Sequence, residues 1–150
     1  MSELRDLYQE VILDHNRRPR NFRALEDADR KAEGFNPLCG DHLTLFLKVR
    51  DQHVVEVAFQ GLGCAISKAS ASLMTEGVKG KTFADVETLY QAFHDMVTGQ
   101  PGQQIDSDRL GKLAVFAGVC EFPVRVKCAT LPWRTLQAAL KDQKSVATTE

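Results

Sequence analysis

The amino-acid sequence predicts an α+β fold in which helices pack on one small antiparallel sheet. Apolar residues occupy every second position along 43–49 and again along 55–59, with Thr44 and Lys48 on the other face, which is the pattern of two half-buried strands. A short polar turn at 51–53 separates them, so we expect an antiparallel hairpin. Apolar residues recur at helical spacing on both sides of this hairpin, and the sequence contains no internal repeat. We therefore expect a single domain over 1–150, with a frayed polar tail at 141–150.

The segment before the hairpin predicts one helix and a long connection. Apolar residues recur at helical spacing over 4–12, and this helix is expected to end near Asn16, ahead of Pro19. Residues 17–38 are polar and show no clear period. We interpret them as a connection that holds a short strand near 34–35.

The segment after the hairpin predicts two successive helices. Small and apolar residues at helical spacing over 66–78 favour a helix that packs closely on the sheet, and Gly80 suits its carboxyl end. Thr82 and Asp85 have the spacing of a capping box, which predicts a second helix over 86–97.

The last third of the chain predicts shorter helices separated by proline and glycine. A break at 99–102 precedes a helix over 110–117. Pro123 can occupy the first position of the next helix. Because Pro132 has no N–H, we expect it to interrupt that helix and leave a final helix over 133–140.

Charge and hydropathy argue against two classes of partner. Lys and Arg number 19 against 20 Asp and Glu, for a net charge of −1, whereas a nucleic-acid binder is normally basic on one face. We interpret the basic run at 17–23 as a solvated loop rather than a docking patch. No stretch approaches the roughly 20 apolar residues of a membrane span, and the N-terminus lacks the layout of a signal peptide. We expect a cytoplasmic protein whose partners include neither nucleic acid nor a membrane.

Cysteines and one aspartate form the most informative pattern in the sequence. Cys39 and Asp41 lie two residues apart in a segment expected to be extended, so their side chains share a face and can approach one ion. Cys64 lies where a Gly-rich turn becomes a helix, and a helix N-terminus favours a thiolate. Cys128 follows the cation of Arg125 by three residues, and a nearby cation has the same effect.

Three thiolates and one carboxylate form a set of four ligands that suits tetrahedral Zn²⁺. Soft sulfur ligands also suit an iron–sulfur cluster, so the ligand types alone leave the metal open. From the residues alone, buried structural cysteines are the leading alternative, because free Cys is among the most buried residue types. We interpret the fourth cysteine, Cys120, as a packing residue and His15, His53 and His94 as surface or capping residues.

Three segments resemble the signature segments of the U-type iron–sulfur cluster assembly proteins, the IscU/NifU N-terminal family. They are Asn36–Asp41 (NPLCGD), Gly61–Ser72 (GLGCAISKASAS) and Phe122–Leu131 (FPVRVKCATL). They occur in the family's order, and the resemblance extends from Leu7 to about Leu140. It implies a small sheet with helices on one side and a metal site at one end.

Two features resemble the SufU-like branch of that family more than the IscU-like branch. In the IscU-like branch a His that takes part in the site precedes the last Cys, whereas this chain has Lys127 there. The stretch between Cys64 and Cys128 is also longer than in that branch, with an additional segment around 100–109. Both departures favour zinc-dependent sulfur relay over an efficient cluster scaffold.

The resemblance also implies specific roles. Carried over by position, the zinc ligands are Cys39, Asp41, Cys64 and Cys128. The implied partner is a SufS-type cysteine desulfurase of the iron–sulfur assembly machinery, with Cys39 as the thiol that receives its persulfide sulfur. Arg125 resembles a family arginine beside the site. This is a sulfurtransferase-like relay rather than a conventional enzyme. The alternatives are a scaffold for an iron–sulfur cluster and a structural zinc domain without sulfur chemistry.

Overall fold

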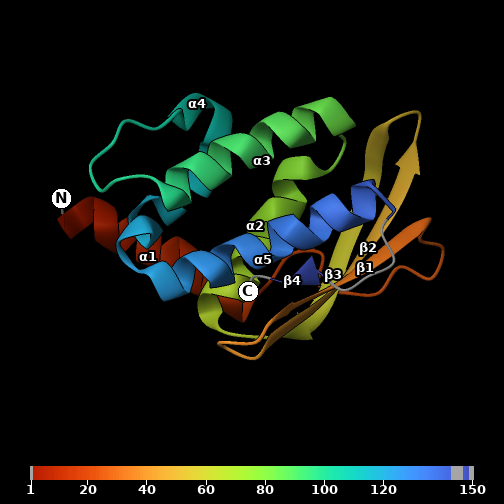
Figure 1. Ribbon diagram of the computed structural model, residues 1–150, viewed down its shortest axis with the longest axis horizontal. Helices are drawn as coiled ribbons and strands as arrows, with labels where there is room; N and C mark the ends of the chain where they lie inside the picture. The colour runs from red at the N-terminus through yellow and green to blue at the C-terminus, as the bar shows by residue number, and fades with distance from the viewer. Residues whose placement is uncertain (1, 143–146, 149–150) are drawn as a thin grey trace.

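A four-stranded sheet forms the centre of the computed structural model, which describes residues 2–142 and 147–148 (Figure 1). The strand order is β3-β2-β1-β4. Neighbours pair antiparallel except β1 and β4, which pair in parallel. The strands are β1 (Arg30–Asn36), β2 (Asp41–Arg50), β3 (His53–Leu62) and β4 (Ala147–Thr148). The predicted α+β class is therefore confirmed.

The hairpin of β2 and β3 follows the predicted alternation. Leu45 pairs with Phe59 and Leu47 pairs with Val57, and all four side chains are buried. At the turn Asp51 and Gln52 have φ of 51° and 63°, the left-handed pair that matches the twist of two antiparallel strands. This turn sets the register that directs the apolar face of both strands inward.

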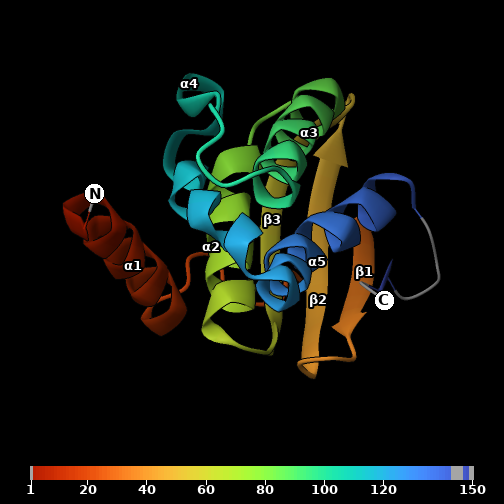
Figure 2. The ribbon, with the colours of Figure 1, turned by 60° about the vertical axis from the view of Figure 1, so that its left-hand side comes forward.

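Helices cover one face of the sheet (Figure 2). α2 and α5 lie directly on the strands, and α1 packs along α2. Trp133 of α5 and Met74 of α2 are fully buried in the shared core. The α-helices are α1 (Ser2–Arg17), α2 (Ala65–Val78), α3 (Phe83–Thr98), α4 (Ser107–Leu110) and α5 (Pro123–Leu140). The connection after α1 lies on the opposite face, where Leu25 packs against Phe46 and Ala58.

β1 is longer than the short strand expected near 34–35. Its inward positions are Ala32, Gly34 and Asn36, which are small or polar and therefore give no apolar alternation in the sequence. Gly34 faces Thr135 and Leu131 of α5 so closely that a Cβ at this position would overlap the Thr135 hydroxyl. The small inward face thus lets α5 lie close to the strand.

The predicted interruption at Pro132 is wrong, because α5 runs unbroken from Pro123 to Leu140. The missing N–H of Pro132 deprives only the Cys128 carbonyl of its helical partner. Leu131, Trp133 and Leu136 are fully buried around it, so packing of this helix on the sheet outweighs the local cost of proline, about 3 kcal/mol.

Two further segments differ from expectation. The predicted helix over 110–117 is a 3₁₀ helix, η1, that spans Gly111–Glu121. In the expected frayed tail, Ala147 and Thr148 instead pair with Gly34 and Phe35 as β4, while 143–146 and 149–150 lie outside the described residues. Within the described part of the chain, no helix combines the length and the apolarity that crossing a membrane requires.

Candidate metal centre

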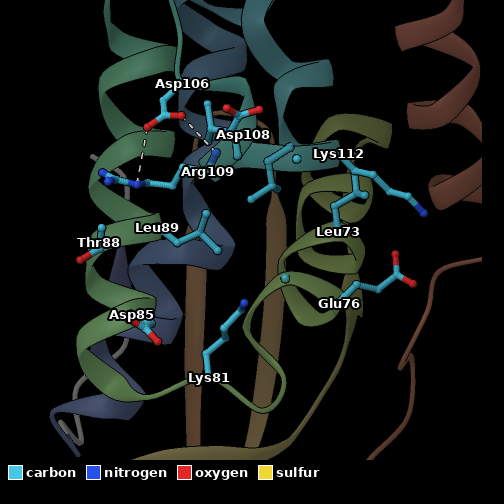
Figure 3. Close-up of a pocket in the computed structure, with 14 residues that line it drawn as sticks. Leu73, Glu76, Lys81, Asp85, Thr88, Leu89, Asp106, Asp108, Arg109 and Lys112 are labelled. Atoms are coloured by element: carbon cyan, nitrogen blue, oxygen red, sulfur yellow. Dashed lines mark hydrogen bonds and ion pairs between the residues drawn. The ribbon is translucent and has the colours of Figure 1, made fainter.

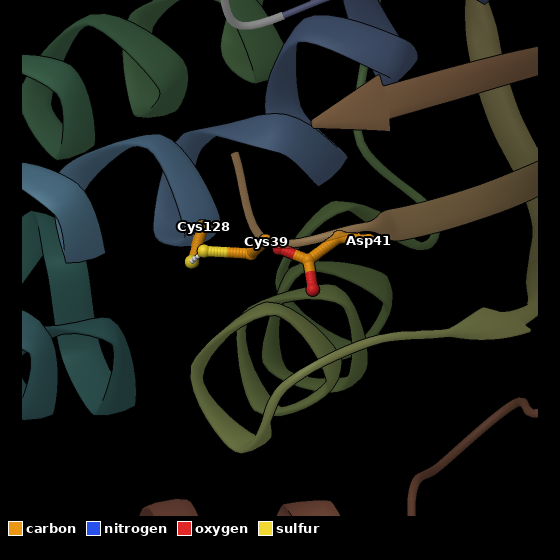
Figure 4. A group of neighbouring side chains, drawn as sticks. All are labelled: Cys39, Asp41 and Cys128. Atoms are coloured by element: carbon orange, nitrogen blue, oxygen red, sulfur yellow. Dashed lines mark hydrogen bonds between the residues drawn. The ribbon is translucent and has the colours of Figure 1, made fainter. Parts of the chain in front are cut away.

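Three elements meet at one end of the sheet and bring two cysteines and an aspartate together (Figure 4). Cys39 lies in the turn between β1 and β2, Asp41 begins β2, and Cys128 lies in the second turn of α5. One ligand atom from each of the three lies within 4.8 Å of the other two. The Cys39 and Cys128 sulfur atoms are 3.4 Å apart. This Cys/Asp group (Cys39, Asp41 and Cys128) is a metal-binding arrangement at the predicted place in the fold.

The turn that carries Cys39 is held by its glycine. Gly40 has φ +72°, a left-handed conformation that a side chain would disfavour. This conformation reverses the chain between Cys39 and Asp41. Cys39 is consequently exposed, whereas Asp41 and Cys128 are buried.

The Asp41 carboxylate is oriented by donors on both of its oxygens. Oδ1 accepts the backbone N–H of Cys64 at 2.9 Å, and Oδ2 accepts the side-chain amide of Asn36 at 3.2 Å. The chain at Gly63 passes so close that a Cβ there would lie 2.8 Å from Oδ1. Glycine at this position therefore permits the start of α2 to approach the carboxylate.

Cys64 is the residue that precedes α2, and its sulfur accepts the N–H of Ser67 at 3.4 Å. The Cys128 thiol beside it lowers the pKa of Cys64 to about 6, against the opposing effect of burial. In return the Cys64 sulfur, followed by burial, raises the pKa of Cys128 far above its usual range. Cys64 therefore loses its proton more readily than Cys128 does.

Three of the four predicted ligands, Cys39, Asp41 and Cys128, thus have ligand atoms within 4.8 Å of one another. The backbone N–H of Cys64 donates a hydrogen bond to Asp41, and the Cys64 sulfur interacts with Cys128. Cys64 is nevertheless not a member of the Cys/Asp group defined by the 4.8 Å separation. Arg125 is exposed on the first turn of α5, and the negative charge of Cys64, then Cys128, raises its pKa. The guanidinium is therefore within electrostatic reach of these two cysteines.

Sequence reasoning missed the roles of two polar residues. Asn36 is fully buried and contacts the Cys/Asp group, although it received no role. The position of Asn36 beside the group follows from the strand register, which pairs Asn36 with Asp41. The expectation that His15 is a surface or capping residue is wrong, because the ring is 3% exposed and lies 2.7 Å from Ser72 Oγ.

The fourth cysteine lies outside the group. Cys120 is half-buried near the end of η1, and its thiol donates to the Ala117 carbonyl at 3.4 Å. This local contact agrees with a packing residue rather than a ligand.

A hollow of about 950 Å³ between α2, α3 and α4 is separate from the cysteines (Figure 3). Positively and negatively charged side chains line it, and Lys81 and Lys112 are among the positive ones. Asp106 and Arg109, from the additional segment and the start of α4, form an ion pair of 3.6 Å at its rim. No cysteine is among its lining residues, so the hollow is distinct from the Cys/Asp group.

Comparison with known proteins agrees with this geometry. Over 143 residues the chain is 38% identical to the zinc-dependent sulfurtransferase SufU of Bacillus subtilis, with 95% of each chain covered. It is 39% identical to the iron–sulfur cluster assembly scaffold protein IscU of Streptococcus pyogenes, covering 94% of this chain and 87% of that one. A crystal structure from Fervidobacterium islandicum, described as a putative iron–sulfur cluster assembly scaffold protein for the SUF system, superposes with a TM-score of 0.81 at 37% identity. That match covers 87% of this chain and 94% of the other. The model of the NifU-like N terminal domain matches residues 7–145, and the chain belongs to this family.

Proposed function

We propose that this chain is an iron–sulfur cluster assembly protein that accepts persulfide sulfur from a SufS-type cysteine desulfurase, with Cys39 as the acceptor. The observation that carries the proposal is the asymmetry of the Cys/Asp group. Its sulfur atoms are 3.4 Å apart, yet Cys39 is exposed while Cys128 and Asp41 are buried. A group with one accessible thiol and two inaccessible ligands suits transfer at that thiol and retention of a metal by the others.

The donor set fits Zn²⁺, which takes four sulfur, nitrogen or oxygen ligands at about 2.0–2.3 Å. The residues that would hold it are Cys39, Asp41, Cys64 and Cys128, from the β1–β2 turn, β2, the start of α2 and α5. Two thiols and the carboxylate already lie within 4.8 Å of one another. Cys64, whose pKa is lowered to about 6, offers a further thiolate beside them. When bound, Zn²⁺ keeps its thiol ligands deprotonated and performs no redox chemistry.

The transfer step requires only thiol–persulfide exchange. The Cys39 thiolate attacks the outer sulfur of the desulfurase persulfide, and a new S–S bond forms between them. The bond between the two sulfurs of the desulfurase persulfide breaks, and its electron pair leaves on the desulfurase cysteine as a thiolate. Sulfur is passed on as a persulfide, so no external oxidant or reductant is needed. The Arg125 guanidinium, which interacts with the charge of Cys64, Cys128 and Cys39, limits repulsion among the thiolates.

A scaffold for a [2Fe–2S] cluster is the second candidate function. It is favoured by the relatives named scaffold proteins, one of which is as similar to this chain as the sulfurtransferase is. Three cysteines and an oxygen ligand also suit such a cluster. The two functions require different metals at the same residues.

The test combines metal content with a desulfurase assay. Protein purified without added metal is analysed for zinc and iron and for visible absorption, then added to a SufS-type desulfurase with free cysteine. One zinc per chain, no visible colour and faster cysteine turnover support the relay. A brown, iron-containing protein without effect on turnover supports the scaffold. Zinc without any effect on turnover in the wild type or in Cys39→Ala supports a purely structural metal.

A further inference from the structure

Asn36 is a buried polar residue. It contacts Asp41 and Cys128, and it also contacts the turn that carries Cys39. It is the last residue of β1 and is 0% exposed. Its backbone carbonyl accepts the N–H of Gly40 at 2.9 Å, and its side-chain Oδ1 accepts the N–H of Leu38 at 3.2 Å. Together these two bonds close the turn on either side of Cys39.

The other end of the same amide faces two expected ligands. Nδ2 donates to Asp41 Oδ2 at 3.2 Å and lies 3.7 Å from Cys128 Sγ. The Leu38 N–H can only donate and the ionised carboxylate can only accept, so the amide fits in one orientation. One rigid planar group therefore fixes the turn, the carboxylate and the buried sulfur relative to one another.

The chemistry of this position selects a neutral amide. A carboxylate at residue 36 would keep an acceptor for the Leu38 N–H but would place negative oxygen against Asp41 and Cys128. A hydroxyl side chain is uncharged but too short to replace both ends of the amide. Asn36, Asp41 and Cys128 are all fully buried, so an unmade bond among these three side chains cannot be replaced freely by water.

We propose that Asn36 is the positioning residue of the metal centre. It sets the Asp41 carboxylate and the Cys128 sulfur in a common orientation toward the ion while it holds the turn that presents Cys39. This inference rests on the proposed function, because it requires a metal at these residues. Groups that orient metal ligands without touching the metal typically change metal affinity by about 10–100-fold when removed.

The test compares Asn36→Asp and Asn36→Ser with a matched control, Asn21→Asp. Asn21 also donates its side-chain amide to another side chain, Thr75 Oγ1 at 3.0 Å, but it lies outside the metal centre. Zinc affinity is measured on each full-length protein by competition with a chromophoric chelator at fixed pH. The absorption of the Co²⁺-substituted protein reports the geometry of the ligands, and circular dichroism with urea unfolding of the metal-free protein reports the fold.

We expect Asn36→Asp to weaken zinc binding about 10–100-fold and to shift the Co²⁺ absorption bands. Asn36→Ser should weaken binding less, because it adds no charge, and Asn21→Asp should leave affinity and bands unchanged. A folded Asn36→Asp or Asn36→Ser protein with wild-type affinity and bands overturns the proposal. Failure of both Asn36 variants to fold, while Asn21→Asp folds, assigns Asn36 to the fold alone and also overturns it. Absence of zinc binding by the wild type instead refutes the proposed function before any variant is compared.

Discussion

The backbone N–H of Cys64 donates to Asp41 Oδ1 at 2.9 Å, which ties the residue preceding α2 to the first residue of β2. An aspartate in this place is therefore a structural acceptor as well as a proposed metal ligand. Its second oxygen accepts the amide of Asn36. The two roles of Asp41 can be separated by substitution.

Asp41→Asn and Asp41→Ala should both lose zinc affinity, since each removes the carboxylate charge. Asp41→Asn keeps one acceptor for the Cys64 N–H, whereas Asp41→Ala loses the acceptors of both bonds. The metal-free Asp41→Ala protein should therefore unfold more easily, by roughly 1 kcal/mol for the additional lost bond. Urea unfolding of both metal-free variants measures this difference. Equal stability of the two variants would argue that the hydrogen bond from the Cys64 N–H contributes nothing to the free energy of unfolding.

Gly63→Ala should disturb the metal centre through the same carboxylate. The new Cβ would lie 2.8 Å from Asp41 Oδ1, so the carboxylate has to move. We expect weaker zinc binding in a chelator competition. Gly77→Ala is the matched control, because the nearest atom to its Cβ is 3.5 Å away on Leu89 and the site is inside α2. That control should keep zinc affinity and gain about 0.5–1 kcal/mol in stability.

These contacts show which parts of the structure the sequence could predict. The hairpin was predictable because Leu45, Leu47, Val57 and Phe59 are large apolar residues that recur at every second position of their strands. β1 was predicted only in part, because its inward residues are small or polar and gain their burial from α5. Continuity of α5 through Pro132 likewise depends on tertiary packing that a local rule does not contain.

The candidate site divides in the same way. The spacing of Cys39 and Asp41 predicted their approach, but the expected extended segment is wrong, because the chain turns at Gly40 with φ +72°. The resemblance to a family supplied the place of Cys128. Convergence of three elements on one point required the strand register and the packing of α5. The role of Asn36 could not be predicted, because it depends on the pairing of Asn36 with Asp41 across a turn.

Zinc removal should lower the melting temperature without unfolding the protein completely. Structural zinc contributes roughly 10–16 kcal/mol in zinc-finger peptides, which have almost no core of their own. This chain buries an extensive core of both sheet and helices, centred on residues such as Phe59 and Trp133. Thermal unfolding followed by circular dichroism before and after chelation, with zinc checked by elemental analysis, measures the shift. An unchanged melting temperature after complete removal would contradict a structural contribution from the metal.

Buried His15 should make stability depend on pH. Burial, followed by the charge of Arg20, lowers its pKa below the ordinary value of 6.5. The unfolded chain therefore binds the proton more readily, so the contribution of neutral His15 is fully present above pH 6.5 and declines as the pH falls below it.

His15→Gln removes this titration while it retains a group that can bond Ser72. As the pH is lowered from 7.5 to 5.5, the free energy of unfolding of the wild type should decrease relative to that of His15→Gln. Urea unfolding of the metal-free proteins at both pH values measures it, and taking the difference cancels the titration of the cysteines. A difference that does not change with pH would show that His15 does not titrate in this range.

The last prediction separates the roles of the four cysteines, because their exposure and contacts differ. Cys39 is exposed in a turn, so Cys39→Ser should abolish persulfide transfer while Asp41 and the other cysteines retain some zinc. Cys64 and Cys128 are fixed at the start of α2 and within α5, so their serine variants should lose zinc and transfer together. Cys120→Ser is the control and should keep both zinc binding and persulfide transfer. The hydrogen bond described for the Cys120 thiol goes to a nearby carbonyl of η1. Each variant is incubated with a SufS-type desulfurase and cysteine, then analysed by mass spectrometry for the sulfur adduct and by elemental analysis for zinc. A Cys39→Ser protein that still gains the adduct and stimulates the desulfurase normally would show that another thiol is the acceptor.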